Sequence, residues 1–156
     1  GDMNTDFLTD TQLKISQKAI ENSSTNIIPK GNIIIATRVG LGKVCILEKD
    51  AAINQDLKGI IPNEKTNAMF LFYWFKSLSS YLISKGAGAT VQGFKLEVLH
   101  ELPLPIISIQ EQNRIVEFLN KINNNQTKLM TELFNQKLDL QKLKSSLLDS
   151  AFKGEL

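Results

Sequence analysis

Hydrophobic residues follow two different patterns along the chain, and the change falls near Pro105. Before this proline, short apolar runs alternate with stretches rich in glycine, proline and asparagine, which favours a mixed domain of strands and helices. After it, apolar residues recur at helical spacing and no glycine occurs until Gly154. We therefore expect the α+β class: a small mixed α/β domain over residues 1–105, followed by a single long coiled-coil-forming helix over residues 106–156.

Three apolar runs in the first part predict β-strands. The β-branched run Ile33–Thr37 gives the clearest signal, and Lys43–Glu48 follows it after the glycine-containing turn Val39–Gly42, so the pair predicts a hairpin. A third strand is expected over Lys58–Pro62. The stretch Ile27–Asn32, which contains both proline and glycine, predicts a turn.

Four other segments of the first part have helical or extended signatures. A short polar helix is expected within Thr11–Asn22. The segment Asn67–Lys85 is apolar around most of a helical surface and predicts a buried helix, with Gly86 as the left-handed residue after its end. Phe94–Leu99 predicts a short helix or turn, and the prolines of Leu102–Ile106 favour extended backbone.

The final segment is the most regular. Ser108 and Glu111 have the spacing of a capping box at a helix start. A strict 4-3 spacing then continues over eleven positions, of which eight are apolar, which predicts a coiled-coil seam. Asn123–Asn125 has poor helix propensity, which favours a local kink or an irregular turn there. The two seam glutamines either fix the register with a partner helix or lie at a loosely packed, wet point. The seam positions are Ile115, Leu119, Ile122, Gln126, Leu129, Leu133, Gln136, Leu140, Leu143, Leu147 and Ser150.

Composition narrows the class only slightly. Hydrophobic residues make up 42% and charged residues 22% of the chain, which is ordinary for a globular protein, and the net charge of +2 is weak support for a nucleic-acid partner. No apolar run approaches the length of a membrane span, and the first residues do not resemble a signal peptide. The single cysteine, Cys45, fits a reducing compartment, so we expect a cytoplasmic protein without a membrane partner.

The residues that usually carry catalysis are scarce. His100 and Cys45 lie far apart and do not form a zinc-binding motif, so we expect His100 to be structural. The stretch Arg38–Lys43 resembles a phosphate-binding loop, but Val44 stands where that motif needs a hydroxyl residue, and the stretch joins two strands. We therefore expect no cofactor, no metal and no catalytic residue.

Polar residues on turns are the candidates for function. Arginine and lysine suit phosphates and guanine, glutamine suits adenine, and threonine contacts phosphates or thymine methyl groups. The alternative for each is an ordinary solvated side chain. For Asn54-Gln55, between two expected strands, we favour hydrogen bonds to the backbone. The candidate DNA-binding residues are Thr37, Arg38, Lys43, Lys85, Thr90, Gln92 and Lys95.

Several stretches together resemble the specificity subunits of type I restriction–modification systems. The first is the strand–turn–strand block Ile33–Val44 with its T-R and G-K pairs, and the second is the N-Q block Asn54–Gly59. The junction into the helix resembles the family in Gly86–Gln92, Leu102–Pro105 and Glu111–Val116. The ending Leu147–Leu156 resembles the end of the family's conserved helical region.

This resemblance implies a target-recognition domain over residues 1–105, without the family's opening strands, and a spacer helix over residues 106–156. Such subunits carry two of each, their helices pack antiparallel, and each domain reads half of a bipartite site on double-stranded DNA. A modification subunit supplies adenine methylation and a restriction subunit supplies cleavage. The resemblance thus implies a non-catalytic DNA-recognition component. Its long helix would pair either with the second half of a longer polypeptide or with a second copy of the chain, and for a half-size chain our hypothesis is the second copy.

Two alternatives remain at this point. The chain is a coiled-coil adaptor whose globular part binds protein, or it is a piece of a methyltransferase or nuclease. The first alternative predicts binding that barely responds to salt, whereas contacts to DNA phosphates weaken steeply as ionic strength rises. The second predicts a cofactor or a catalytic motif, and the sequence shows neither.

Overall fold

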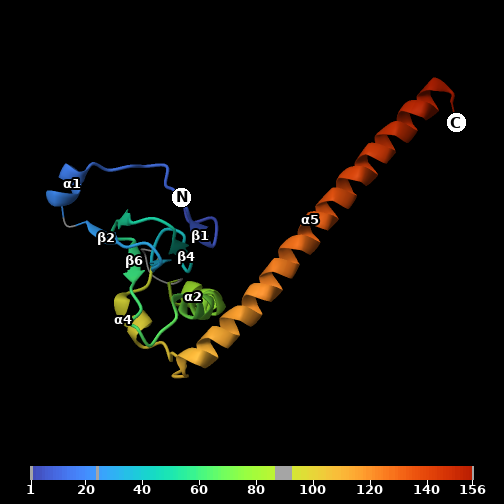
Figure 1. The fold of residues 1–156 in the computed structure, drawn as a ribbon. Helices are drawn as coiled ribbons and strands as arrows, with labels where there is room; N and C mark the ends of the chain where they lie inside the picture. The colour runs from blue at the N-terminus through green and yellow to red at the C-terminus, as the bar shows by residue number, and fades with distance from the viewer. Residues whose placement is uncertain (1, 24, 87–92, 156) are drawn as a thin grey trace. The chain divides into compact units, whose positions relative to one another are not determined.

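The computed structural model describes residues 2–23, 25–86 and 93–155. The chain divides into two compact units, Gly1–Val116 and Glu117–Leu156. The first unit holds all the strands of the described residues and the shorter helices, and the second consists of most of the long C-terminal helix (Figure 1). The structure is therefore a mixed α/β domain followed by a long helix, as the sequence predicts.

The main sheet is built around the predicted hairpin. Strand β3 (Ile33–Ala36) pairs antiparallel with β4 (Val44–Leu47), and Ile34 lies opposite Cys45. The sheet has the order β1–β4–β3–β6, in which β6 (Leu57–Ile60) is antiparallel to β3 and the two-residue strand β1 (Phe7–Leu8) is parallel to β4. The three predicted strands are confirmed, and β1 was not predicted.

Both faces of this sheet are covered, which explains the unbroken apolar runs of β3 and β4. Ile33 and Ile35 point to one face and pack with Phe72 and Leu82, whereas Ile34 and Cys45 point to the other face. Burial raises the pKa of the Cys45 thiol from its ordinary 9.0 to about 11. The thiol therefore stays protonated and enclosed at neutral pH.

A second, two-stranded pairing corrects the prediction of a turn at residues 27–32. Strand β2 (Asn26–Ile28) pairs antiparallel with β5 (Ala51–Ile53), and the turn is confined to the residues after Pro29. Gly31 lies in that turn with φ of +82°, a conformation that favours glycine. Each strand has only three residues, too few to show the alternating pattern of a strand.

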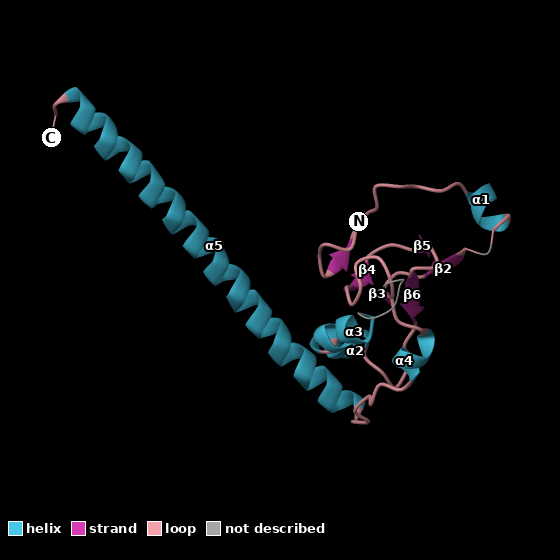
Figure 2. Ribbon diagram, turned by 180° about the vertical axis from the view of Figure 1, so that it is seen from behind, coloured by secondary structure: helices cyan, strands magenta, loops and turns pink. Residues whose placement is uncertain are grey.

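The predicted helix over Asn67–Lys85 is two helices, α2 (Ala68–Ser77) and α3 (Ser79–Gly86), separated at Leu78. Figure 2 shows them together beside the sheet. The α2 helix starts where the side chain of Asn67 accepts hydrogen bonds from two backbone N–H groups of the first turn. The apolar pattern continues through the break, so periodicity alone did not reveal it.

Gly86 is the last residue of α3 and not a left-handed residue after it, which corrects the predicted C′ role. A Cβ at this position would lie 2.3 Å from Cδ2 of Leu41, so close packing against the hairpin explains the glycine. The polar helix near the N-terminus is also shorter than expected: α1 covers only Gln17–Glu21 and starts at the capping side chain of Ser16. Of the short helix or turn predicted over Phe94–Leu99, the structure has the helix, α4 (Leu96–His100).

The C-terminal helix α5 spans Ile109–Lys153, 45 residues, or about 68 Å at ~1.5 Å per residue. Ser108 Oγ accepts a hydrogen bond from the Glu111 backbone N–H, as the capping box predicts. Arg114 donates two hydrogen bonds to the Glu111 carboxylate, which lower the pKa of that carboxyl. The helix runs without a break through Asn123–Asn125, so the predicted kink or irregular turn is wrong.

The start of α5 is fixed to the globular unit through one buried side chain. Gln112 is 4% exposed. Its carbonyl oxygen accepts from the Asn67 N–H at 2.8 Å, and its amide group donates to the carbonyls of Lys65 and Ile107, both at 3.1 Å. Asn67 also donates through its side chain to Asn113 Oδ1 at 2.7 Å. The N-terminus of α2 and the first turn of α5 therefore form one hydrogen-bonded junction.

Candidate nucleic-acid interface

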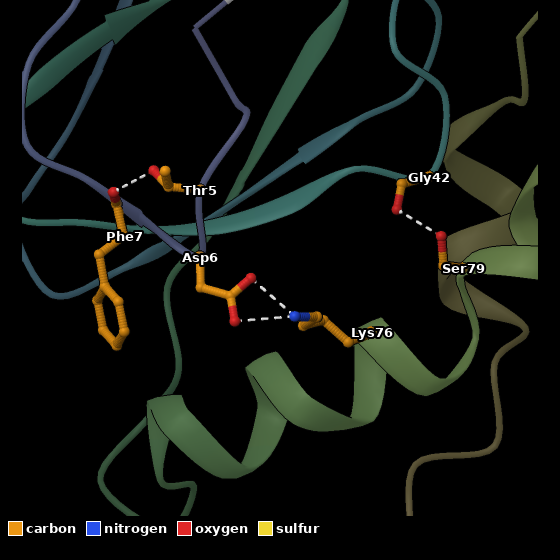
Figure 3. Close-up of polar contacts among 6 residues, drawn as sticks. All are labelled: Thr5, Asp6, Phe7, Gly42, Lys76 and Ser79. Atoms are coloured by element: carbon orange, nitrogen blue, oxygen red, sulfur yellow. Dashed lines mark hydrogen bonds and ion pairs between the residues drawn. The ribbon is translucent and has the colours of Figure 1, made fainter. Parts of the chain in front are cut away.

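The turn between β3 and β4 is the centre of the candidate surface. Gly40 and Gly42 both have φ of +75°, which a side chain would strain, and Lys43 N donates to the Gly40 carbonyl at 3.0 Å. Ser79 Oγ donates to the Gly42 carbonyl at 3.1 Å and ties the turn to the start of α3 (Figure 3). The turn thus leaves Val39 74% exposed at a fixed position.

The N-terminal segment supports the same region from another side. Lys76 of α2 donates to both carboxylate oxygens of Asp6, at 2.7 and 2.8 Å (Figure 3). Lys43 Nζ donates to Asn4 Oδ1 at 2.9 Å, and its side chain is exposed. The charge of Lys76 is therefore balanced by Asp6, whereas Lys43 has a neutral partner and keeps its positive charge available for an anion.

Two residues beside the turn are held by the β5–β6 connection. Thr37 is 3% exposed, and both its backbone N–H and its hydroxyl donate to the Asp56 carbonyl, at 2.9 and 3.1 Å. Arg38 Nη1 lies 3.3 Å from Asp56 Oδ1, with 47% of the arginine side chain exposed. The Thr37 side chain therefore faces the interior and supports the turn, whereas Arg38 faces solvent.

The Asn54-Gln55 block has the structural role that the sequence predicts for its asparagine. Asn54 Oδ1 accepts a hydrogen bond from the Asp56 N–H at 3.1 Å, and the Asn54 carbonyl accepts from Leu57 N. This side-chain turn fixes the backbone of Asp56. Asp56 itself was missed from the sequence, and the only signal for it was its place directly after the N-Q pair.

Two further candidates, Lys85 and Lys95, lie on segments that contact the hairpin. Lys85 is exposed at the end of α3, with Nζ 5.2 Å from the centre of the Tyr81 ring. Lys95 is exposed directly after Phe94, whose N–H donates to the Thr37 carbonyl at 3.0 Å. Thr90 and Gln92 lie outside the residues that the structure describes. The fold therefore gathers Arg38, Lys43, Lys85 and Lys95 on segments that contact one hairpin.

The second candidate surface is the predicted seam of α5. Six of its apolar side chains are between 45% and 67% exposed in the single chain. Gln126 and Gln136 are exposed as well. This stripe has the spacing of a coiled-coil interface and is uncovered along the second unit. The six are Ile122, Leu129, Leu133, Leu140, Leu143 and Leu147.

Within residues 2–23, 25–86 and 93–155, no group of three or more His, Cys, Asp or Glu side chains is placed to hold a metal ion. In the same part of the chain, none of the helices has the length and apolarity that crossing a membrane requires.

The first unit thus carries a hairpin fixed by hydrogen bonds with exposed basic side chains beside its turn, and the long helix carries an exposed apolar stripe. The chain belongs to the family described as the type I restriction modification DNA specificity domain, whose model matches residues 1–138. The match covers the hairpin, the junction at Gln112 and most of the long helix.

Individual proteins similar in sequence to this chain are specificity subunits of type I restriction enzymes. The chain is 29% identical over 154 residues to the type I restriction enzyme MjaIX specificity subunit of Methanocaldococcus jannaschii, covering 96% of this chain and 35% of that protein. It is 30% identical over 146 residues to the EcoR124I/EcoR124II specificity subunit of Escherichia coli, covering 90% and 36%. The chain thus spans about a third of the length of these curated relatives.

Solved structures show the same fold. One is a chain from a study of complex assembly and conformational transition of the type I R-M system, with a TM-score of 0.76 and 22% identity over 86% of this chain and 33% of that one. Another is the HsdS subunit from Thermoanaerobacter tengcongensis, with a TM-score of 0.65 and 22% identity over 83% of this chain and 31% of that one.

Proposed function

We propose that this chain is a non-catalytic DNA-recognition component of a type I restriction–modification complex, reading one half-site and spacing it through α5. The observation that carries the proposal is the hairpin at residues 37–43, which holds Arg38 and Lys43 on a rigid turn within a specificity-domain fold. Basic side chains on a fixed turn suit phosphate oxygens and base edges. In the cytoplasm, the modification and restriction subunits would supply methylation and cleavage.

We also propose that a second long helix covers the α5 seam, and that a second copy of the chain can supply it. The midpoint of Ile109–Lys153 is residue 131. An antiparallel pair whose two-fold axis passes beside residue 131 places Gln126 against the partner's Gln136. All the remaining seam layers between residues 115 and 147 are apolar on both sides. Those layers are Ile115–Leu147, Leu119–Leu143, Ile122–Leu140 and Leu129–Leu133.

This register gives the two seam glutamines a role. In one layer their amides bond to each other, whereas a shift of the register by one heptad in either direction places each against leucine and leaves buried polar groups unpaired. The antiparallel arrangement also places the two helix starts, each carrying a globular unit, at opposite ends of the pair. Two half-sites separated by a fixed gap are the expected DNA target of such a pair.

The proposal is tested by selection from a random pool of DNA duplexes, with the chain co-expressed with its modification subunit. We expect one short motif, or two copies of it at a fixed gap. The Lys43→Ala variant should bind the selected duplex about 3- to 10-fold more weakly at ~0.1 M salt, because one phosphate contact and its counterion release are lost. The slope of log affinity against log salt should shrink by about 0.9.

Lys18→Ala is the matched control, since Lys18 is an exposed lysine of α1. It should leave both affinity and salt slope unchanged. Equal effects of the two substitutions would mean that Lys43 contributes only to the general charge of the chain. Failure to select any motif, with the complex still assembled, would contradict the proposal and favour the coiled-coil adaptor, whose binding depends little on salt.

A further inference from the structure

Asp56 and Arg38 form a pair whose burial is unequal. Oδ1 of Asp56 is buried and accepts no hydrogen bond within the described part of the chain, while the Arg38 side chain is 47% exposed. A buried carboxylate oxygen without a hydrogen bond is costly unless a positive charge lies close to it. Arg38 Nη1, at 3.3 Å, is that charge, so its guanidinium is held toward Asp56 more firmly than an ordinary surface ion pair would hold it.

The backbone on both sides of the pair is also fixed. Asp56 is positioned by the side chain of Asn54 and by two donations from Thr37 to its carbonyl. On the other side, Gly93 has φ of +150°, and a Cβ there would lie 2.8 Å from Arg38 Cγ and 2.9 Å from the Thr37 carbonyl oxygen. Cγ of Arg38 therefore lies close to the backbone at Gly93, while its head group lies beside the β5–β6 connection.

This arrangement places the N–H donors of the Arg38 guanidinium in two different environments. Nη1 faces Asp56, whereas Nε and Nη2 make no hydrogen bond within the described residues. These two groups form the planar edge that donates two parallel hydrogen bonds, the geometry that matches O6 and N7 of guanine. Asp56 also offsets the positive charge of Arg38, which weakens its attraction to phosphates but leaves the planar edge intact. A base is therefore a better match for Arg38, and a phosphate for Lys43.

We propose that Arg38 reads a guanine in the major groove and that Asp56 is the positioning residue that orients its guanidinium. This assignment rests on the proposed function and names one base of the half-site. It gives the N-Q block, which includes Asp56, a role in specificity, because Asp56 sets the direction of the Arg38 head group without contacting DNA itself.

Selection from the randomised duplex pool, followed by binding to the selected duplex and to its single-base variants, tests the assignment. Arg38→Ala should abolish the preference for guanine at one position and leave the others. Asp56→Asn should lower that same preference about tenfold, the order of magnitude of one bidentate contact. It should also bind duplex lacking the motif as tightly as the wild type or more tightly, with a steeper salt dependence, because the charge of Arg38 is no longer offset.

The controls separate positioning from folding. Glu48→Gln removes the same charge at the opposite end of β4 and should leave the guanine preference unchanged. In the Arg38→Ala background, Asp56→Asn should change the preference no further. If Asp56→Asn lowers the melting temperature too far for binding to be measured, Arg38→Lys replaces it: this variant keeps the charge but lacks the planar edge, so guanine preference should fall while non-specific affinity persists.

Three outcomes would count against these proposals in different ways. Enrichment of a motif whose guanine preference survives Arg38→Ala overturns the assignment and leaves the proposed function standing. So does an Asp56→Asn variant that weakens binding to all duplexes equally. No enrichment by the wild-type chain in its complex contradicts the proposed function itself.

Discussion

Leu133→Asp is expected to separate the proposed helix pair, weakening it about 1,000-fold or more. Leu133 lies on the seam and is 58% exposed in the single chain, so a partner would bury it. In the antiparallel register, the layer next to the axis pairs Leu133 with the partner's Leu129, and it occurs twice. Each substitution removes about 1.5–3 kcal/mol of apolar burial and places a carboxylate in an apolar layer, where desolvation adds to the loss.

Sedimentation over a wide range of protein concentration measures this effect. Leu138→Asp is the matched control, because Leu138 is on the same helix, 40% exposed, and off the seam. The control should pair as the wild type does. A wild-type chain that stays monomeric up to about millimolar concentration would remove the second copy as a partner, and the seam would then need a helix of another chain.

The direction of the pair is tested with two single-cysteine changes. In the antiparallel register, a mixture of Gln126→Cys and Gln136→Cys chains should cross-link on oxidation, and neither variant should cross-link alone. In a parallel pair each seam residue would instead face the same residue of the partner, so each variant would cross-link to itself. In that pair Glu132 and Asp139 would face the partner's Lys137 and Lys144. The native Cys45 should not interfere, because it is buried and burial raises its pKa to about 11.

The second large effect is expected at the junction between α2 and α5. Gln112→Ala should lower the free energy of unfolding of the first unit by about 2–4 kcal/mol. The change removes the partner of the Asn67 N–H and of the carbonyls of Lys65 and Ile107, three part-buried contacts. A polar group left unpaired away from water costs about 1–3 kcal/mol. Urea unfolding, followed by the fluorescence of Trp74, measures the loss.

Gln110→Ala supplies the comparison, since Gln110 is exposed in the same helical turn. It should change stability by less than about 0.5 kcal/mol, the usual range for a surface substitution. Equal effects of the two substitutions would show that the Gln112 hydrogen bonds contribute nothing beyond helix propensity. Such a result would remove this junction as the element that fixes the start of α5.

Local signals in the sequence were enough for two parts of the fold. The hairpin β3–β4 follows from a β-branched run, a turn with two glycines and a second apolar run, all within sixteen residues from Ile33 to Glu48. The long helix α5 follows from a capping serine and a seam that repeats over many turns. In both elements, residues close together in the sequence determine the conformation, so these elements can be predicted without knowledge of distant contacts.

The short strands and the break between α2 and α3 depend instead on residues that are far apart in the sequence. β1, β2 and β5 have two or three residues each and exist because a distant segment supplies their hydrogen-bond partners. The division between α2 and α3 at Leu78 occurs where Ser79 meets the Gly42 carbonyl of the hairpin. Such features depend on tertiary contacts, and the local pattern of apolar residues does not contain them.

The residues of the candidate interface also divide into those that local sequence predicts and those that depend on tertiary contacts. The positions of Arg38 and Lys43 beside a glycine-rich turn could be predicted from residue order, because the turn and its flanking residues are adjacent in the chain. The burial of Thr37, and the contact between Arg38 and Asp56, nineteen residues after Thr37, became known from the folded structure. The physical reason is that an ion pair and a buried hydroxyl need two segments to meet, and the pairing of β3 with β6 brings those segments together.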